Sequence, residues 1–215
     1  MDAQTTNVLT NLFHAGFLIL YFWLSIKYDL RKSVKVFFFF LLSAKIFGSA
    51  VHYVKDTTLK EILWLCVAAN VLCINYYIYK VVRSKHPFWV LGLPTVSILI
   101  FCLPIFSHIL GSPVFLKFAM LFPFSPRNFI YVALAVLWVG IAGALSTKSL
   151  VRIGFSLTAG SNILWIVLRK TLSALHGDIL PEGLRYDNDL YHIALIVSTY
   201  ILFKGLCSQK RNQTL

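Results

Sequence analysis

Residues 34–54 read VKVFFFFLLSAKIFGSAVHYV, an apolar run long enough to cross a lipid bilayer as one α-helix. A helix rises 1.5 Å per residue, so about 20 apolar residues span the hydrocarbon core. Similar runs recur along the chain, with short connections between them. We therefore predict an all-α, polytopic membrane protein, a seven-transmembrane-helix bundle that forms a single domain over residues 1–215. The seven predicted runs are residues 8–26, 34–54, 61–82, 88–110, 129–145, 150–168 and 189–206.

The composition agrees with a lipid environment. Of the 215 residues, 58% are hydrophobic and only 13% are charged, whereas a soluble domain carries about 25% charged residues. The net charge of +12 could suggest a nucleic-acid partner. However, the basic residues stand at the ends of apolar runs, where they meet lipid headgroups. We therefore expect membrane lipids as partners and no nucleic acid.

Three other segments carry expectations of their own. The first residues, MDAQTTNVLTNLFH, lack the basic region and cleavage site of a signal peptide, so the first run is expected to remain as an anchor. Residues 112–128 contain two Ser-Pro steps and Pro123, which predict an interfacial loop or a short re-entrant piece. The four cysteines show no CxxC spacing, which favours buried free thiols over a disulfide frame or a zinc knuckle.

Lysine and arginine positions predict the orientation, because basic residues gather in short cytoplasmic loops. With the N-terminus outside, twelve of the 20 basic residues lie on the cytoplasmic side, seven lie outside, and Lys45 lies within a span. We therefore predict an outside N-terminus and a cytoplasmic C-terminus. The cytoplasmic set is Lys27, Arg31, Lys32, Lys35, Lys80, Arg83, Lys85, Lys148, Arg152, Lys204, Lys210 and Arg211.

The second run carries the first candidate site residues, Lys45, Ser49 and His52. Their spacings of four and three residues place them on one helix face. An ionisable side chain at mid-membrane costs about 3 kcal/mol on insertion scales, so Lys45 is expected to face the bundle interior and to have a partner. The alternative is that Lys45 reaches toward the interface or forms a purely structural ion pair.

The last run opens with YDNDLYHIALIVSTY, residues 186–200. Asp189 and His192 are three residues apart and Asn188 and His192 four apart, so helical geometry brings them together. A carboxylate and an imidazole can ligate one metal, or the carboxylate can orient the imidazole as a base. The alternative is a helix cap made by Asn188 and Asp189, with His192 as an interfacial residue.

The predicted helix directions bring the two clusters to one membrane depth. The second span would run outward and the seventh inward, which places His52, Asp189 and His192 near the outer face with Lys45 below them. His52, His192 and Asp189 are therefore candidate metal ligands, with zinc as the candidate metal. Ser49, Asp189 and Lys45 are candidate catalytic residues. No GxSxG, HExxH or phosphate-loop motif is present.

This layout resembles the seven-helix membrane hydrolase superfamily of alkaline ceramidases and adiponectin-receptor-like proteins. Members hold zinc with one histidine of the second helix and two of the seventh, with a serine and an aspartate nearby. His52 matches the second-helix histidine, and Asn188 and His192 occupy the positions of the seventh-helix HxxxH pair. The family's serine position is Gly48 here, one residue before Ser49.

Two main functions remain open from the residues. The resemblance implies a membrane-embedded hydrolase of a lipid amide or ester, zinc-dependent in the family's manner, with a lipid-like substrate. A transporter or ligand-binding protein is the alternative, in which Lys45 and Asp189 form a buried ion pair beside the substrate path. A structural or assembly subunit is the third possibility, and it predicts no effect of replacing His52 or His192.

Overall fold

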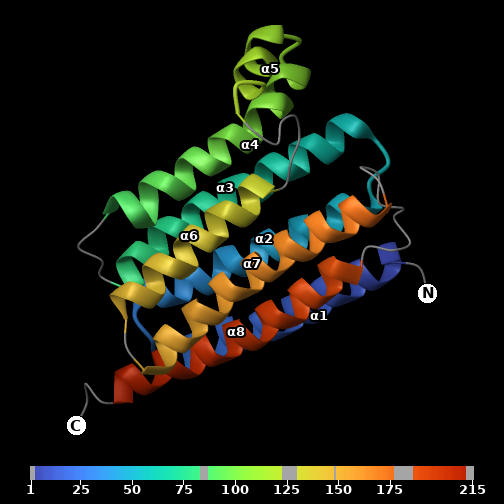
Figure 1. The fold of residues 1–215 in the computed structure, drawn as a ribbon. Helices are drawn as coiled ribbons and strands as arrows, with labels where there is room; N and C mark the ends of the chain where they lie inside the picture. Colours follow the sequence, from blue (N-terminus) through green and yellow to red (C-terminus); the bar gives the residue numbers. More distant parts are fainter. Residues whose placement is uncertain (1–2, 83–86, 123–129, 148, 177–185, 212–215) are drawn as a thin grey trace.

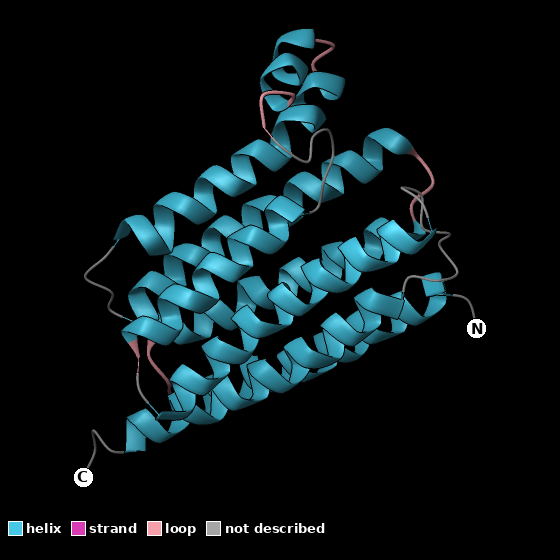
Figure 2. Cartoon of the chain, viewed as in Figure 1, coloured by secondary structure: helices cyan, strands magenta, loops and turns pink. Residues whose placement is uncertain are grey.

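The computed structural model describes residues 3–82, 87–122, 130–147, 149–176 and 186–211. Over these residues the chain is helical, and no strand occurs in them (Figure 2). The predicted all-α fold is therefore confirmed for the described part of the chain. The elements are α1 (Ala3–Lys27), α2 (Lys32–Tyr53), α3 (Thr57–Val82), η1 (Phe88–Gly92), α4 (Leu93–Ile109), α5 (Pro113–Ala119), α6 (Ile130–Ser146), α7 (Ser149–His176) and α8 (Tyr186–Arg211).

Six stretches in these helices are long and apolar enough to cross a membrane, and they belong to α1, α2, α3, η1 with α4, α7 and α8. The apolar helix α6 has 17 residues and is shorter than the others. Large apolar side chains also cover the outside of the bundle, including Phe13, Trp23 and Ile163, each more than half exposed. Such a surface is expected where lipid is the solvent. The chain thus has the fold of a multi-pass membrane protein.

Proline marks the irregular helix in the bundle. The π-helical turn η1 leads into α4, and Pro94 lies at the start of α4 without an N–H to donate to the preceding turn. Pro104 lies inside α4. At the end of α4, Gly111 has a φ of +61°, which a glycine adopts readily.

The segment predicted as a loop or re-entrant piece contains a short helix. α5 begins at Pro113, after the extended residue Ser112, and it projects beyond the end of α4 (Figure 1). Proline favours the first turn of a helix, where its missing N–H has no partner to lose. Residues 123–128 of the predicted segment lie outside the described residues.

Six helices pack as a closed ring. α1 contacts α2, α2 contacts α3, α3 contacts α6, α6 contacts α7, α7 contacts α8, and α8 returns to α1 (Figure 1). α4 packs outside this ring against α3 and α6. The first and last helices run parallel, since Thr10 bonds Asp189 near their starts and Tyr21 stacks on Phe203 farther along. This parallel contact brings the N-terminal and C-terminal helices to one site.

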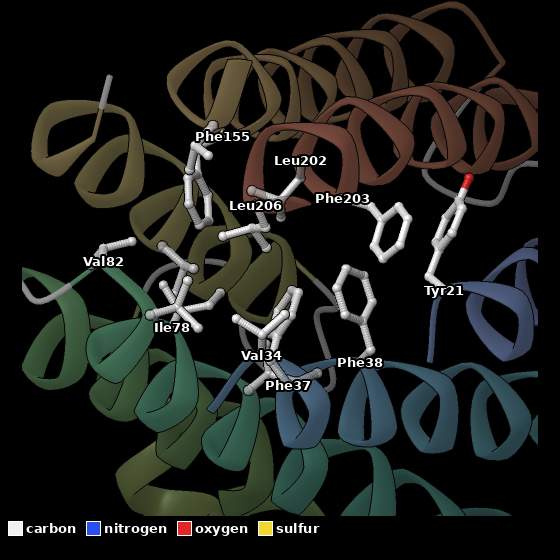
Figure 3. Close-up of a cluster of buried hydrophobic side chains, with 14 of the residues drawn as sticks. Tyr21, Val34, Phe37, Phe38, Ile78, Val82, Phe155, Leu202, Phe203 and Leu206 are labelled. Carbon is white, nitrogen blue, oxygen red and sulfur yellow. The ribbon is translucent and has the colours of Figure 1, made fainter. Parts of the chain in front are cut away.

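An aromatic cluster fills the half of the ring nearer the C-terminal end of α8 (Figure 3). Tyr21 of α1 stacks on Phe203 of α8 with ring centroids 4.9 Å apart. Phe38 of α2 meets the edge of both rings, at 6.0 Å from Tyr21 and 5.6 Å from Phe203. Aromatic pairs in this geometry add about 0.5–1.5 kcal/mol to their burial. The cluster therefore holds α1, α2 and α8 in register below the polar residues described next.

Candidate functional site

A cavity of about 330 Å³ lies inside the ring, lined by α1, α2, α3, α6, α7 and α8. Its polar lining is supplied mainly by α1, α2 and α8, through residues such as Asn11, Lys45 and His192. Apolar side chains line the remainder, among them Ile78 and Leu202 of the cluster in Figure 3. A volume of this order accommodates a small molecule, and pockets of this kind combine an apolar wall with a few polar groups.

Lys45, His192 and Asn11 form a continuous hydrogen-bonded chain at this cavity. The amine Nζ of Lys45 lies 3.0 Å from Nδ1 of His192, and Nδ2 of Asn11 lies 3.0 Å from Nε2 of the same ring. Three different helices, α2, α8 and α1, thus meet at one imidazole. His192 is buried, so both ring nitrogens take protein partners rather than water.

The hydrogen-bond chain admits two proton arrangements, because a neutral imidazole carries one N–H. If the amide nitrogen of Asn11 donates to Nε2, then Nδ1 carries the proton and donates to a neutral Lys45 amine. If Lys45 donates to Nδ1, then Nε2 carries the proton and the amide oxygen of Asn11 must accept it. Moving one proton and turning one amide interconverts the two. Only the second arrangement also accommodates a protonated Lys45, which still donates to Nδ1, so the pair can hold one proton more in it than in the first.

Two further histidines line the same cavity. His14 is buried on α1, its Nε2 lies 3.0 Å from the hydroxyl of Thr199, and its Nδ1 has no hydrogen-bond partner among the described residues. His52 lies on α2, seven residues or about two turns beyond Lys45, toward the end where α8 begins. His52 and His192 thus line the same cavity.

The lining is basic. Lys45, Lys60 and the three histidines contribute nitrogen atoms, whereas no aspartate or glutamate is found among the described residues that line the cavity. Such a wall favours a ligand with an anionic or electron-rich oxygen, because it offers hydrogen-bond donors and positive charge without a competing carboxylate.

Asp189 and Ser49 are placed differently from the prediction. The carboxylate of Asp189 accepts a hydrogen bond from Thr10 at 3.0 Å, and Lys45 is bonded to His192 instead of to Asp189. The predicted Lys45/Asp189 ion pair is therefore not formed. Ser49 donates its hydroxyl to the backbone oxygen of Lys45 at 2.9 Å and is not among the residues that line the cavity. A serine bonded in this way is satisfied within its own helix.

The donor set does not fit a zinc ion in this arrangement. Among the residues that the structure describes, no group of three His, Cys, Asp or Glu side chains could hold a metal ion. The ring nitrogens of His192 are hydrogen-bonded to Lys45 and Asn11, and Asp189 accepts from Thr10. Zinc stays a prediction of the family resemblance.

Asn11, Thr10, His14 and Thr199 were not among the residues predicted for the site. A signal for two of them was present, since Asn11 and His14 are three residues apart and share one face of an apolar helix. Thr199 stands seven residues after His192, on the same face of α8. The contacts between these residues of α1 and α8 depend on the parallel packing of the two helices, which a local sequence pattern does not predict.

No family model, curated protein or solved structure matches this chain. The fold and the cavity therefore carry the functional argument. They define a class, a helical multi-pass membrane protein with an internal cavity that is polar and basic on one side and apolar on the other.

Proposed function

We propose that the chain crosses the membrane seven times, with its N-terminus outside and its C-terminus in the cytoplasm. The six long apolar helices and the shorter α6 supply the seven spans. A helix of 17 residues is about 25 Å long, close to the thickness of the hydrocarbon core. The chain ends lie at opposite ends of the bundle, as an odd number of crossings requires (Figure 1). The excess of basic residues supplies the direction.

We propose further that this protein is a membrane-embedded hydrolase of a long-chain lipid amide or ester. The observation that carries this proposal is the Lys45–His192–Asn11 chain at the wall of a cavity that is otherwise largely apolar. The acyl chain would occupy the apolar part, and its carbonyl oxygen would face the basic groups. In the proposed orientation, the end of the cavity that carries His52 and His192 lies in the outer half of the membrane.

The proposed reaction uses the proton-holding capacity of the Lys45–His192 pair. A water molecule attacks the carbonyl carbon, and the pair accepts the proton that this oxygen loses. The same proton is then given to the departing nitrogen or oxygen as the C–N or C–O bond breaks. The products are a fatty acid and an amine or alcohol, and the new carboxylate lies next to basic side chains. The resemblance to the ceramidase-like superfamily supports the same reaction class.

Lys45→Met tests this function, because methionine keeps an unbranched side chain and removes the amine. We expect purified wild-type protein to cleave a long-chain fluorogenic amide or its matching ester, and Lys45→Met to lose at least about a hundredfold in rate, the usual contribution of acid–base catalysis. Lys204→Met is the matched control, since Lys204 lies over the ring of Tyr200 on an exposed face of α8. It should retain wild-type activity.

Three results discriminate the alternatives. Equal activity of wild type and Lys45→Met would overturn the proposed catalytic role. Binding of the lipid by wild type without turnover would point to a ligand-binding protein or transporter instead. Zinc in stoichiometric amount in the purified protein, lost in both His52→Ala and His192→Ala, would restore the metal-dependent mechanism that the resemblance implies.

A further inference from the structure

Asn75 is a buried amide whose hydrogen-bonding capacity is unused. It lies on α3, lines the cavity and is 1% exposed. Neither its amide nitrogen nor its amide oxygen has a hydrogen-bond partner among the described residues. By contrast, Asn70 of the same helix donates to the backbone oxygen of Cys66 at 2.7 Å. Buried amides are almost always paired, so an unpaired one that faces a cavity indicates a ligand group that completes it.

The position of Asn75 along the cavity follows from ring contacts. Phe40 of α2 stacks on Tyr77 of α3 at 5.8 Å, which places Asn75 about level with residue 42 of α2. Tyr21 of α1 is level with Phe38 of α2. Together these two contacts relate the level of Asn75 to α1, through α2. At 1.5 Å per residue, Asn75 lies roughly 10 Å farther along the cavity than Asn11 and the imidazole of His192 that Asn11 bonds.

The surroundings of Asn75 are mainly apolar at this depth. Ile74 and Ile78 flank it on the same helix and also line the cavity, and Phe155 and Leu202 line it from α7 and α8. The polar lining on α7 and α8 is Thr158, Ser198 and Thr199 near this level. The hydroxyl of Thr158 bonds that of Ser198 at 3.2 Å, and the hydroxyl of Thr199 lies 3.0 Å from Nε2 of His14. Asn75 is therefore a polar group without a partner among the described residues, next to the apolar side chains that would hold an acyl chain.

We propose that Asn75 recognises a second hydrogen-bonding group, such as a hydroxyl or keto oxygen, carried in the middle of the acyl chain of the ligand. This inference rests on the proposed function, because the carbonyl end of that ligand lies at Lys45 and His192. The amide of Asn75 both donates and accepts, so it pairs with a hydroxyl in either direction. The substrate class is thus a long-chain lipid with an oxygenated chain.

Binding of two fatty acids tests the inference, because a fatty acid is the product of the proposed reaction. The probes are stearic acid and its mid-chain hydroxy derivative, titrated into detergent-solubilised protein with tryptophan fluorescence or calorimetry as the readout. Wild type should bind the hydroxy acid about tenfold more tightly, the factor expected when a buried amide gains its missing partner. Asn75→Leu, which has a similar shape and no polar atom, should bind both acids equally.

Control variants separate the outcomes. Asn70→Leu should retain the wild-type preference, since Asn70 does not line the cavity. If Asn75→Leu does not fold, Asn75→Ala carries the same test, because alanine also removes the amide and is smaller. Equal affinity of wild type for the two acids, or an unchanged preference in the Asn75 variant, overturns the role of Asn75 alone. Failure of both acids to bind wild type overturns the proposed function and this inference together.

Discussion

At the scale of single residues, Lys45 shows why an ion within an apolar helix needs a partner. Its amine lies in a span, where an unpaired charge costs about 3 kcal/mol on insertion scales. The structure brings it to the imidazole of His192 at 3.0 Å, across from α2 to α8. The partner of Lys45 is thus an imidazole, which carries no negative charge, and not a carboxylate. The cavity wall therefore stays basic and can bind an oxygen atom of a ligand.

Asp29 is a charged residue that lies outside the membrane-spanning helices. It lies in the turn between α1 and α2 with a φ of 43°, a left-handed conformation that Asp and Asn tolerate better than most residues. The hydrogen bond from Lys35, at 2.7 Å, and the charges of Lys35 and Lys210 lower the pKa of the Asp29 carboxyl. Lys210 also donates to the backbone oxygens of Tyr28 and Asp29 at 2.7 Å.

We predict that replacing Asp29 by Asn changes the stability of the protein in a pH-dependent way. The variant keeps the left-handed turn but removes the charge, so it should unfold at a slightly lower temperature than wild type at pH 7. Because the folded-state pKa is lowered, the carboxylate stabilises the protein above its unfolded pKa of about 3.9 and loses this effect as the pH falls through the folded pKa. Thermal unfolding measured at pH 7 and pH 3 checks this.

The difference between wild type and Asp29→Asn should therefore be smaller at pH 3 than at pH 7. It should also shrink in high salt at pH 7, because the ion pair is exposed. A difference as large at pH 3 as at pH 7 would show that the carboxylate charge is not responsible.

At the scale of elements, small residues set how closely the helices pack. A Cβ added to Gly154 of α7 would lie 2.8 Å from the backbone nitrogen of Leu202, and one added to Gly205 of α8 would lie 2.7 Å from that of Val151. Gly140 of α6 meets α7 in the same way, at 2.8 Å from the backbone nitrogen of Ala159. Helices in a membrane are surrounded by apolar lipid, so the hydrophobic effect does not drive them together. Close backbone contacts of this kind stabilise their association by van der Waals packing.

Gly154→Ala is expected to destabilise the protein, although alanine is the better helix former. The added methyl group would overlap the backbone of α8, and overpacking of this kind costs about 1–3 kcal/mol. Gly160→Ala is the matched control, because it lies on the same helix with nothing within 4 Å of the added Cβ. It should be neutral or stabilising by up to about 1 kcal/mol.

Thermal unfolding of the two glycine variants in the same detergent provides the comparison. Equal stability of Gly154→Ala and Gly160→Ala would contradict the close contact between α7 and α8.

At the scale of the whole molecule, the closed ring makes α1 and α8 neighbours. Asn11 and His14 of α1 reach His192 and Thr199 of α8, although about 180 residues separate each pair in the sequence. Removing the first helix would therefore remove one wall of the cavity as well as one span. The proposed orientation places this shared site in the outer half of the membrane.

Cysteine labelling tests the seven spans and their direction. In a variant without the four native cysteines, Ser112→Cys and Asp56→Cys should react with a membrane-impermeant maleimide in sealed cells. Tyr28→Cys and Thr147→Cys should react only after the membrane is opened. Ser112 and Thr147 lie on either side of α6 in the sequence, so labelling of this pair tests whether that shorter helix crosses the membrane.

The reversed pattern would overturn the proposed orientation while leaving the number of spans intact. Labelling of Ser112→Cys and Thr147→Cys from the same side would show that α6 does not cross, and would leave six spans.

Local patterns were enough for several features of this fold. Runs of apolar residues predicted the main helices, because a helix in lipid must satisfy its backbone within itself and expose apolar side chains. They missed α5, since proline-rich composition does not distinguish a loop from a short helix that begins at a proline. The spacing of Lys45 and His52 correctly placed both on one face toward the interior.

The sequence by itself determined an all-helical chain of membrane-spanning length, the inward face of α2 and the polar start of α8. Each follows from interactions within one helix or between one helix and lipid. Only the tertiary structure decided that Lys45 pairs with His192, that Asp189 turns to Thr10, and that Asn11, His14 and Asn75 enter the cavity. These contacts depend on which helices become neighbours and at what register. That choice is made by glycine contacts and ring packing across the bundle, which short-range periodicity does not encode.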